Sequence, residues 1–86
     1  MDDAKLKLLG YVISSTYRTE VMKTLIEKPK FPSQIAKDIG IKQNHISNVL
    51  NQLKEKELII LINPEVKKGR IYELTDVGLE IAKELK

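Results

Sequence analysis

The sequence of 86 residues has no cysteine and only one histidine, and its four glycines are scattered. Without cysteine there can be no disulfide and no thiolate metal site, and the redox compartment stays undecided. The single histidine, His45, has no cysteine or second histidine to complete a metal site or a catalytic pair. None of the glycines forms a phosphate-cradling loop. We therefore expect no enzyme, no catalytic residue, no metal and no cofactor.

Long apolar runs are also missing. None approaches the roughly 18 residues that cross a membrane, and the N-terminus does not have the pattern of a signal peptide. We therefore expect a cytoplasmic protein without a membrane partner. The length favours a single domain, 1–86, that buries about 60% of its unfolded surface and leaves no room for a separate sensor domain.

Two apolar stripes with helical spacing lie on either side of Gly40. The first consists of Ile35, Ala36 and Ile39, and the second of Ile46, Val49, Leu50 and Leu53. Gly40 can take the left-handed conformation that ends a helix, so that Ile41 and Lys42 leave only a tight connection. Two short helices joined in this way cross at a steep angle. The sequence therefore predicts helices over 32–39 and 43–56.

The helix expected over 43–56 has a polar face with no carboxylate before Glu55. Asparagine is a poorer helix former than the lysine and glutamate that usually cover a solvated face. Its amide offers a donor and an acceptor that match the N6 and N7 edge of adenine in the major groove. The alternative is a merely soluble surface or local caps, above all for Gln43. The candidate base-reading residues are Gln43, Asn44, His45, Ser47, Asn48 and Asn51, with Gln52 on the same surface.

A short apolar run rich in isoleucine predicts a strand over 58–62, and a second strand is expected over 70–74. The basic segment 63–69 would join them as a hairpin. Alternation places Leu58, Ile60 and Ile62 on one face with Tyr72 and Leu74, and Ile59, Leu61 and Ile71 on the other. Because both faces are apolar, we expect the second to pack under the N-terminal helix or a partner subunit. The alternative is a normally buried strand in a small monomer.

In the order and spacing of these elements, the chain resembles winged helix-turn-helix transcription regulators of the small archaeal and bacterial kind, close to the ArsR-like branch. The matching segments are 15–26, 32–36, 40–50, 58–59, 69–75 and Gly78, which together span nearly all of the chain. The resemblance implies a mainly α fold with a small β-hairpin, built as a three-helix core plus wing. The remaining expected helices are 2–13, 15–28 and 76–85, so the N- and C-terminal helices are extra to the core.

Two positions depart from the pattern of this family. Phe31 stands where a serine or threonine usually caps the helix at 32–39, so this helix must rely on Pro32 at its first position. Glu57 stands where a glycine usually follows the recognition helix, and a glutamate has no easy left-handed conformation. Both changes concern helix ends and neither lies on the expected DNA-reading face.

Positive charge is concentrated in the segments that a winged helix presents to phosphate. The net charge of +3 divides into +3 over 28–45, +2 over 63–70 and −2 over the rest of the chain. Contacts from such residues give affinity without sequence information. Arg70 is placed for a minor-groove or phosphate contact, and Arg18 could touch phosphate or pair with an acidic neighbour. The candidate backbone and wing contacts are Arg18, Lys37, Lys42, Lys67, Lys68 and Arg70.

The terminal helices exceed what a bare DNA-reading module needs. Leu6, Leu9 and Ile13 form an apolar stripe near the N-terminus, and Ile81 and Leu85 continue one at the C-terminus. In the relatives that the chain resembles, such helices form the dimer interface, so we expect a homodimer. The alternative is that the N-terminal helix only closes the monomer core.

These observations predict a sequence-specific regulator of transcription, a repressor, that binds double-stranded DNA. Its recognition helix would lie in the major groove and its basic wing on the minor groove or backbone. Two alternatives stay open: a winged helix used for protein contact within a transcription complex, and a nonspecific nucleic-acid binder. The operator sequence and any effector are not encoded in a recognisable way.

Overall fold

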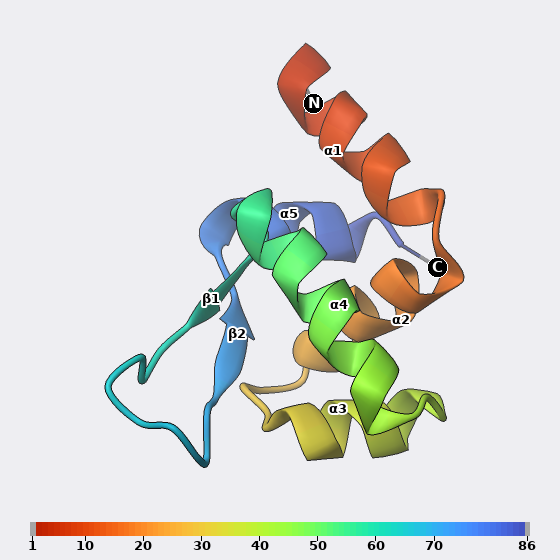
Figure 1. Cartoon of the computed structure of the whole chain (residues 1–86). Coiled ribbons are helices and arrows are strands. Elements are labelled where there is room, and N and C mark those ends of the chain that lie inside the picture. Colours follow the sequence, from red (N-terminus) through yellow and green to blue (C-terminus); the bar gives the residue numbers. More distant parts are fainter. Residues whose placement is uncertain (1, 86) are drawn as a thin grey trace.

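The computed structural model describes residues 2–85, and it contains five helices and a two-stranded antiparallel sheet (Figure 1). This mainly helical architecture with a β-hairpin confirms the predicted fold class. The elements are α1 (Asp3–Ile13), α2 (Thr16–Leu25), α3 (Pro32–Ile39), α4 (Gln43–Glu55), β1 (Ile59–Leu61), β2 (Tyr72–Leu74) and α5 (Asp76–Lys83). The helix α1 extends away from the body that the other elements form (Figure 1).

Side-chain oxygens cap three of the helices at their N-termini. Asp2 accepts from the Lys5 amide at 2.9 Å, and Thr75 accepts from the Gly78 amide at 3.0 Å. Ser15 caps α2 in the same way. Each of these bonds satisfies an amide that the first turn of a helix leaves without a partner. The caps explain why the chain breaks between α1 and α2 and between β2 and α5.

The start of α3 has no side-chain acceptor, as the phenylalanine at position 31 implies. Pro32 occupies the first turn, and the Gln34 Oε1 atom accepts from the Phe31 amide at 3.0 Å. This bond is the return half of a capping box. It fixes the entry of the chain into α3 without help from the Phe31 side chain.

Several expected element bounds differ from the structure. The helix expected over 15–28 ends at Leu25, because Pro29 disfavours the helical conformation of Lys28 and the Ile26 amide already bonds to the Lys23 carbonyl. The other helices are shorter than expected by at most two residues at either end, which is the usual fraying of helix termini. The strands expected over 58–62 and 70–74 contain three residues each.

The C-terminal end of α4 is closed by a left-handed residue that is not a glycine. Glu57 has a φ of 57°. The Glu57 amide donates to the Lys54 carbonyl at 2.9 Å, and the Leu58 amide donates to the Leu53 carbonyl at 3.0 Å. These two bonds form a Schellman motif, which normally has glycine at the left-handed position. The chain therefore forms this motif with a glutamate at the position where glycine is usual.

The hairpin pairs Ile59 with Leu74 and Leu61 with Tyr72, so these four residues share one face. That face is turned to the core, and Ile60 and Ile62 are 49% and 44% exposed. The predicted arrangement, with Ile60 and Ile62 on the face of Tyr72 and Leu74, is wrong. The reason is the register of the hairpin, which places Ile59 opposite Leu74 and Leu61 opposite Tyr72, so that Ile60 pairs with Glu73 on the other face.

A residue outside the hairpin completes the sheet. The Lys30 amide donates to the Tyr72 carbonyl and the Tyr72 amide to the Lys30 carbonyl, both at 3.0 Å. The Lys30 side chain is 4% exposed, and its Nζ atom lies 2.7 Å from both Asp38 Oδ2 and Thr24 Oγ1. The segment before α3 therefore ties β2 to the α2 and α3 helices. Nothing in the sequence pattern predicts this bridge.

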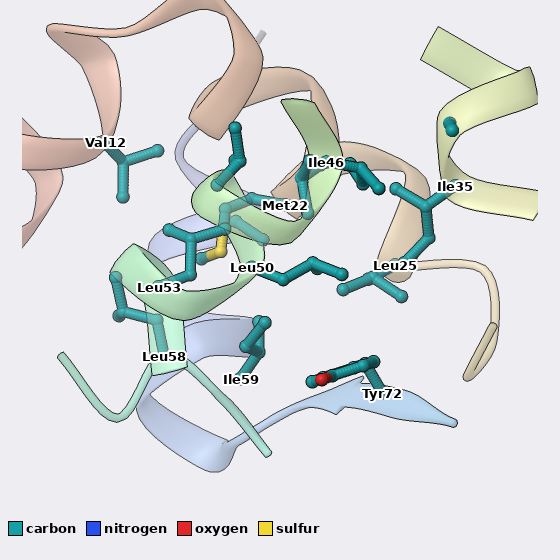
Figure 2. Packing of buried hydrophobic residues seen from close by; sticks show 14 of the residues in the cluster. Val12, Met22, Leu25, Ile35, Ile46, Leu50, Leu53, Leu58, Ile59 and Tyr72 are labelled. Atoms are coloured by element: carbon teal, nitrogen blue, oxygen red, sulfur yellow. The ribbon is translucent and has the colours of Figure 1, made fainter. Parts of the chain in front are cut away.

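One hydrophobic core joins all the elements (Figure 2). Met22 of α2 and Leu53 of α4 lie at its centre, with Ile59 and Tyr72 of the wing beneath them (Figure 2). Gly78 packs so closely on the end of α4 that an added Cβ would lie 1.9 Å from the Leu58 carbonyl oxygen. The wing and α5 are therefore seated directly on the helical core.

Among residues 2–85, none of the helices is both long enough and apolar enough to cross a membrane.

Candidate nucleic-acid interface

The outer face of α4 is polar along its whole length. Its inner side buries Ile46, Val49, Leu50 and Leu53 in the core. The predicted base-reading residues, Gln43, Asn44, His45, Ser47, Asn48 and Asn51, are all exposed. The first carboxylate along α4 is Glu55, in its last turn. The helix therefore presents hydrogen-bonding groups without negative charge to the solvent.

The connection between α3 and α4 holds this face outward. Gly40 has a φ of 71°, and the Ile41 amide donates to the Ala36 carbonyl at 3.0 Å. Ile41 is buried in the core, which anchors the short link. The N-terminal turn of α4 therefore emerges directly beside the C-terminal turn of α3, where Lys37 is exposed.

The tip of the wing is ordered by a single asparagine. The Asn63 Nδ2 atom donates to the Gly69 carbonyl at 2.9 Å, and its Oδ1 atom accepts from the Ile71 amide at 2.8 Å. Gly69 has a φ of 73°, which lets the chain turn back at this point. From the sequence, Asn63 is only the first residue of the segment 63–69 that joins the two expected strands. Its position at the start of a Gly-containing loop was the available signal, because asparagine side chains commonly bond to nearby backbone.

The basic residues of the wing lie beside the start of α3. Lys67, Lys68 and Arg70 are exposed and line a shallow groove together with Phe31 and Ser33. The Arg70 Nε atom donates to the Val66 carbonyl at 3.2 Å, which orients its guanidinium across the wing. Lys42 is exposed immediately before α4. The positive groups of the wing, α3 and the start of α4 are therefore solvent-accessible.

Arg18 lies in a different environment from these residues. Its Nε atom donates to Gln52 Oε1 on α4 at 3.1 Å, and its Nη1 atom donates to the Tyr11 carbonyl on α1 at 2.9 Å. Gln52 is correspondingly half-buried and does not extend the open polar face. These internal bonds fit a structural position, so we leave Arg18 out of the proposed phosphate contacts.

Lys30 and Asp38, which both count in the net charge over 28–45, pair with each other. The hydrogen bond from Lys30, followed by that from Thr24, lowers the pKa of the Asp38 carboxyl below its usual value. Since the two charges cancel, the excess of positive charge over 28–45 resides on Lys28, Lys37 and Lys42. All three are exposed.

Within the described part of the chain, no three acidic or histidine side chains lie close enough together to hold a metal ion. His45 is instead one of the exposed residues of α4.

A helix-turn-helix followed by a two-stranded hairpin defines the winged helix class of fold. The model of the bacterial regulatory protein family arsR matches residues 16–60, which is just over half of the chain, so the chain belongs to this family. The matched span runs from α2 to the first strand of the wing. The family and the fold are those of transcriptional regulators and not of enzymes. No curated protein sequence matches the chain significantly.

Solved structures of winged-helix regulators resemble the chain over most of its length. Wild-type ZitR of Lactococcus lactis in complex with DNA has a TM-score of 0.73 at 22% identity, and the match covers 81% of this chain and 49% of ZitR. A mutant of ZitR in its apo form has a TM-score of 0.74 at 22% identity, and the match covers 98% of this chain and 70% of the ZitR chain. A MarR family regulator from Silicibacter pomeroyi DSS-3 has a TM-score of 0.75 at 16% identity, and the match covers 96% of this chain and 62% of the regulator. The chain thus spans about half of the DNA-bound ZitR chain, and the likeness shows the fold.

Proposed function

We propose that this protein is a sequence-specific DNA-binding transcription regulator that acts as a repressor. The observation that carries the proposal is the outer face of α4, where six exposed polar side chains stand without a carboxylate. The asparagines of this face weaken the helix that bears them, so their presence calls for a function. Their amides offer a donor and an acceptor that match the edge of adenine in the major groove. The DNA-bound structure of ZitR, which shares the fold, supports this proposal.

In the proposed complex, α4 lies in the major groove. Asn44, Ser47 and Asn48, in the first half of the helix, would reach the bases, and the amides of the two asparagines fit adenine. Gln43, His45 and Asn51 would complete the reading face. Helix-turn-helix proteins use the N-terminal part of this helix for base contacts in the same way.

The exposed basic residues would position the protein on the backbone. Lys37 and Lys42 would contact phosphates beside the major groove, and Lys67, Lys68 and Arg70 would reach the minor groove or the neighbouring phosphates. These contacts supply affinity for any sequence, and the face of α4 supplies the selectivity.

We further propose a homodimer formed through α1 and α5. Leu6 and Ile13 of α1 are 52% and 58% exposed, and Tyr17 of α2 and Leu79 of α5 are also exposed. An apolar surface of this kind is costly in water and marks an interaction site. Two-fold pairing would present two α4 helices about 34–36 Å apart, one turn of DNA. Occupancy of a promoter by such a dimer would exclude other proteins from it.

Selection of bound duplexes from a random pool tests the specificity, symmetry and spacing together. We expect an enriched palindrome with adenine in each half-site. In competition assays, Asn48→Ala should lose roughly 1–3 kcal/mol of discrimination at one position, whereas Arg70→Ala should weaken all duplexes alike. Lys23→Ala, in the last turn of α2 and outside both the proposed DNA contacts and the proposed dimer helices, is the control for a lost positive charge.

Two results would favour the other functions. Enrichment of no sequence, with Asn48→Ala binding as the wild type does, indicates a nonspecific nucleic-acid binder. Absence of binding at low salt indicates a winged helix used for protein contact.

A further inference from the structure

The Arg18 side chain connects the helix that we propose for dimerisation with the helix that we propose for base reading. On α4, its Nε atom donates to Gln52 Oε1 at 3.1 Å. At the end of α1, its Nη1 atom donates to the Tyr11 carbonyl at 2.9 Å and to the Ser14 hydroxyl at 3.1 Å. One guanidinium therefore bonds to two helices while its own backbone belongs to a third, α2.

The Tyr11 ring adds a second link between the same helices. The Arg18 guanidinium lies 3.9 Å from the centre of this ring, and the Lys56 ammonium of the α4 C-cap lies 5.1 Å from it. Cations at these distances over a ring are attracted by its negative face. We call Tyr11, Ser14, Arg18, Gln52 and Lys56 the junction cluster. It surrounds one side chain of α1 with groups from α2 and α4.

The planar guanidinium of Arg18 restricts the directions in which it can form hydrogen bonds. Its donors are held in one plane at fixed angles, so bonds from Nε and Nη1 constrain the relative direction of their two acceptors. The acceptors belong to α4 and α1, so the junction cluster constrains the angle between these helices. The main packing partners of α1 are α2 and α5, and the cluster is its side-chain connection to α4.

We propose that Arg18 is a positioning residue for DNA recognition, which fixes α4 relative to α1 and so sets the half-site spacing that a dimer accepts. This role rests on the proposed function, because it requires a dimer that reads two half-sites. If α1 is held by the partner subunit, a change of its angle to α4 displaces each recognition helix along the groove. Loss of the junction would then broaden the spacing that is tolerated while each half-site is still read.

The test uses the full chain and duplexes that carry two selected half-sites. Their centre-to-centre spacing is varied in steps of one base pair around the 10 to 10.5 of a helical turn, and a single half-site duplex is the reference. Arg18→Met removes the donors and keeps the aliphatic stem. Gln52→Leu removes only the acceptor on α4, and Gln52→Glu keeps an acceptor there. Lys23→Met, in the last turn of α2 and outside both the proposed DNA contacts and the proposed dimer helices, is the control for the loss of one positive charge.

We expect the wild type to prefer its best spacing over a shift of one base pair by about tenfold, and Arg18→Met and Gln52→Leu to reduce this ratio to about threefold or less. Binding of the single half-site should stay within about twofold for Arg18→Met, because the bases are read by other residues. Gln52→Glu should bind all duplexes more weakly, since it adds a negative charge near DNA, yet keep the wild-type ratio. A merely structural Arg18 would lower stability and leave the ratio unchanged.

The possible failures can be told apart. A wild type that binds no DNA overturns the proposed function and this role with it. A wild type with a clear spacing preference that Arg18→Met and Gln52→Leu both retain overturns the positioning role alone, and so does loss of the preference in Gln52→Glu. If Arg18→Met does not fold, as judged by circular dichroism, Gln52→Leu decides, because it leaves the bonds from Arg18 to α1 in place.

Discussion

At the scale of single residues, the conformation of Glu57 lowers the stability of the folded state. Its left-handed conformation brings a Cβ close to backbone atoms, which costs about 1–2 kcal/mol for a residue other than glycine. Glu57→Gly should therefore raise the free energy of unfolding by about 1 kcal/mol, after the greater freedom of glycine in the unfolded chain is subtracted. Urea denaturation followed by circular dichroism measures this difference.

The matched control for that prediction is Glu57→Ala. Alanine keeps the Cβ but removes the carboxylate, which opposes the dipole at the end of α4 by a few tenths of a kcal/mol. We expect alanine to change the stability by no more than this amount. Equal stabilisation by alanine and glycine would show that the charge, and not the backbone conformation, is the cost at this position.

Two glycines in helices should respond in opposite ways to alanine. A Cβ at Gly78 would lie 1.9 Å from the Leu58 carbonyl oxygen and 2.9 Å from its carbon, so Gly78→Ala must push α5 away from the end of α4. We expect a loss of about 3 kcal/mol. A Cβ at Gly10 would meet nothing within 4 Å, so Gly10→Ala should stabilise the protein by about 0.5–1 kcal/mol. Thermal or urea unfolding of both variants tests the pair.

At the scale of elements, the ion pair between Lys30 and Asp38 joins the segment before α3 to α3 itself and gives a pH dependence. The pKa of Asp38 in the folded state is lowered from 3.8, so its stabilising effect is complete above that pH and is lost as the pH falls through the folded-state pKa. Asp38→Asn should therefore be less stable than the wild type at neutral pH, and the difference should shrink below about pH 4. Urea titrations at several pH values measure it.

Lys30→Met provides the background that isolates this pair. Without the ammonium, the largest cause of the lowered pKa is gone, while the hydrogen bond from Thr24 and the charge of Lys28 remain. Adding Asp38→Asn in this background should therefore produce a difference that depends less on pH over the same range. An equal pH dependence in the two backgrounds would show that Lys30 is not the main cause of the lowered pKa.

Most elements of this fold could be predicted because their causes are local. Ser15 and Thr75 mark helix starts, Gly40 marks a helix end, and the apolar stripe of α4 follows the helical period. The faces of the wing could not be predicted, because every residue of 58–62 is apolar and the alternation therefore does not fix the register in which the two strands pair. The bridge between Lys30 and Tyr72 is equally hidden, since a charged residue gives no sign that it will be buried.

The residues of the candidate site also divide into those that the sequence predicts and those that only the tertiary structure reveals. The exposed face of α4 follows from the helical period, and the basic wing follows from the charges within one segment. Both could therefore be predicted from the sequence. The environment of Arg18 depends on three helices that meet at one point, and its partners Tyr11 and Gln52 are seven and 34 positions away. The role of Asn63 depends on the exact closure of the wing. Both required the tertiary structure.

At the scale of the whole molecule, the proposed dimer requires that the exposed apolar residues of α1 contact the partner subunit. Ile13 is the most exposed large apolar side chain of this helix, so Ile13→Glu should place a charge in the interface and yield a monomer. Sedimentation equilibrium should give twice the monomer mass for the wild type and the monomer mass for the variant. Ile26→Glu is the control, because Ile26 is also exposed but lies at the opposite end of α2. A wild type that sediments as a monomer contradicts the proposal.

Lys30 binds the base of the wing to the helices twice, through its backbone to Tyr72 and through its ammonium to Asp38. Detachment of β2 would break both backbone hydrogen bonds and leave a buried cation beside an opened core, which is costly enough to couple the wing to global unfolding. The Lys30 and Tyr72 amide hydrogens should then exchange with solvent as slowly as those of the core helices. A hairpin whose base is already ordered in this way loses little conformational entropy on binding DNA. The contacts of its basic tip therefore contribute to the affinity without a large cost for ordering the wing.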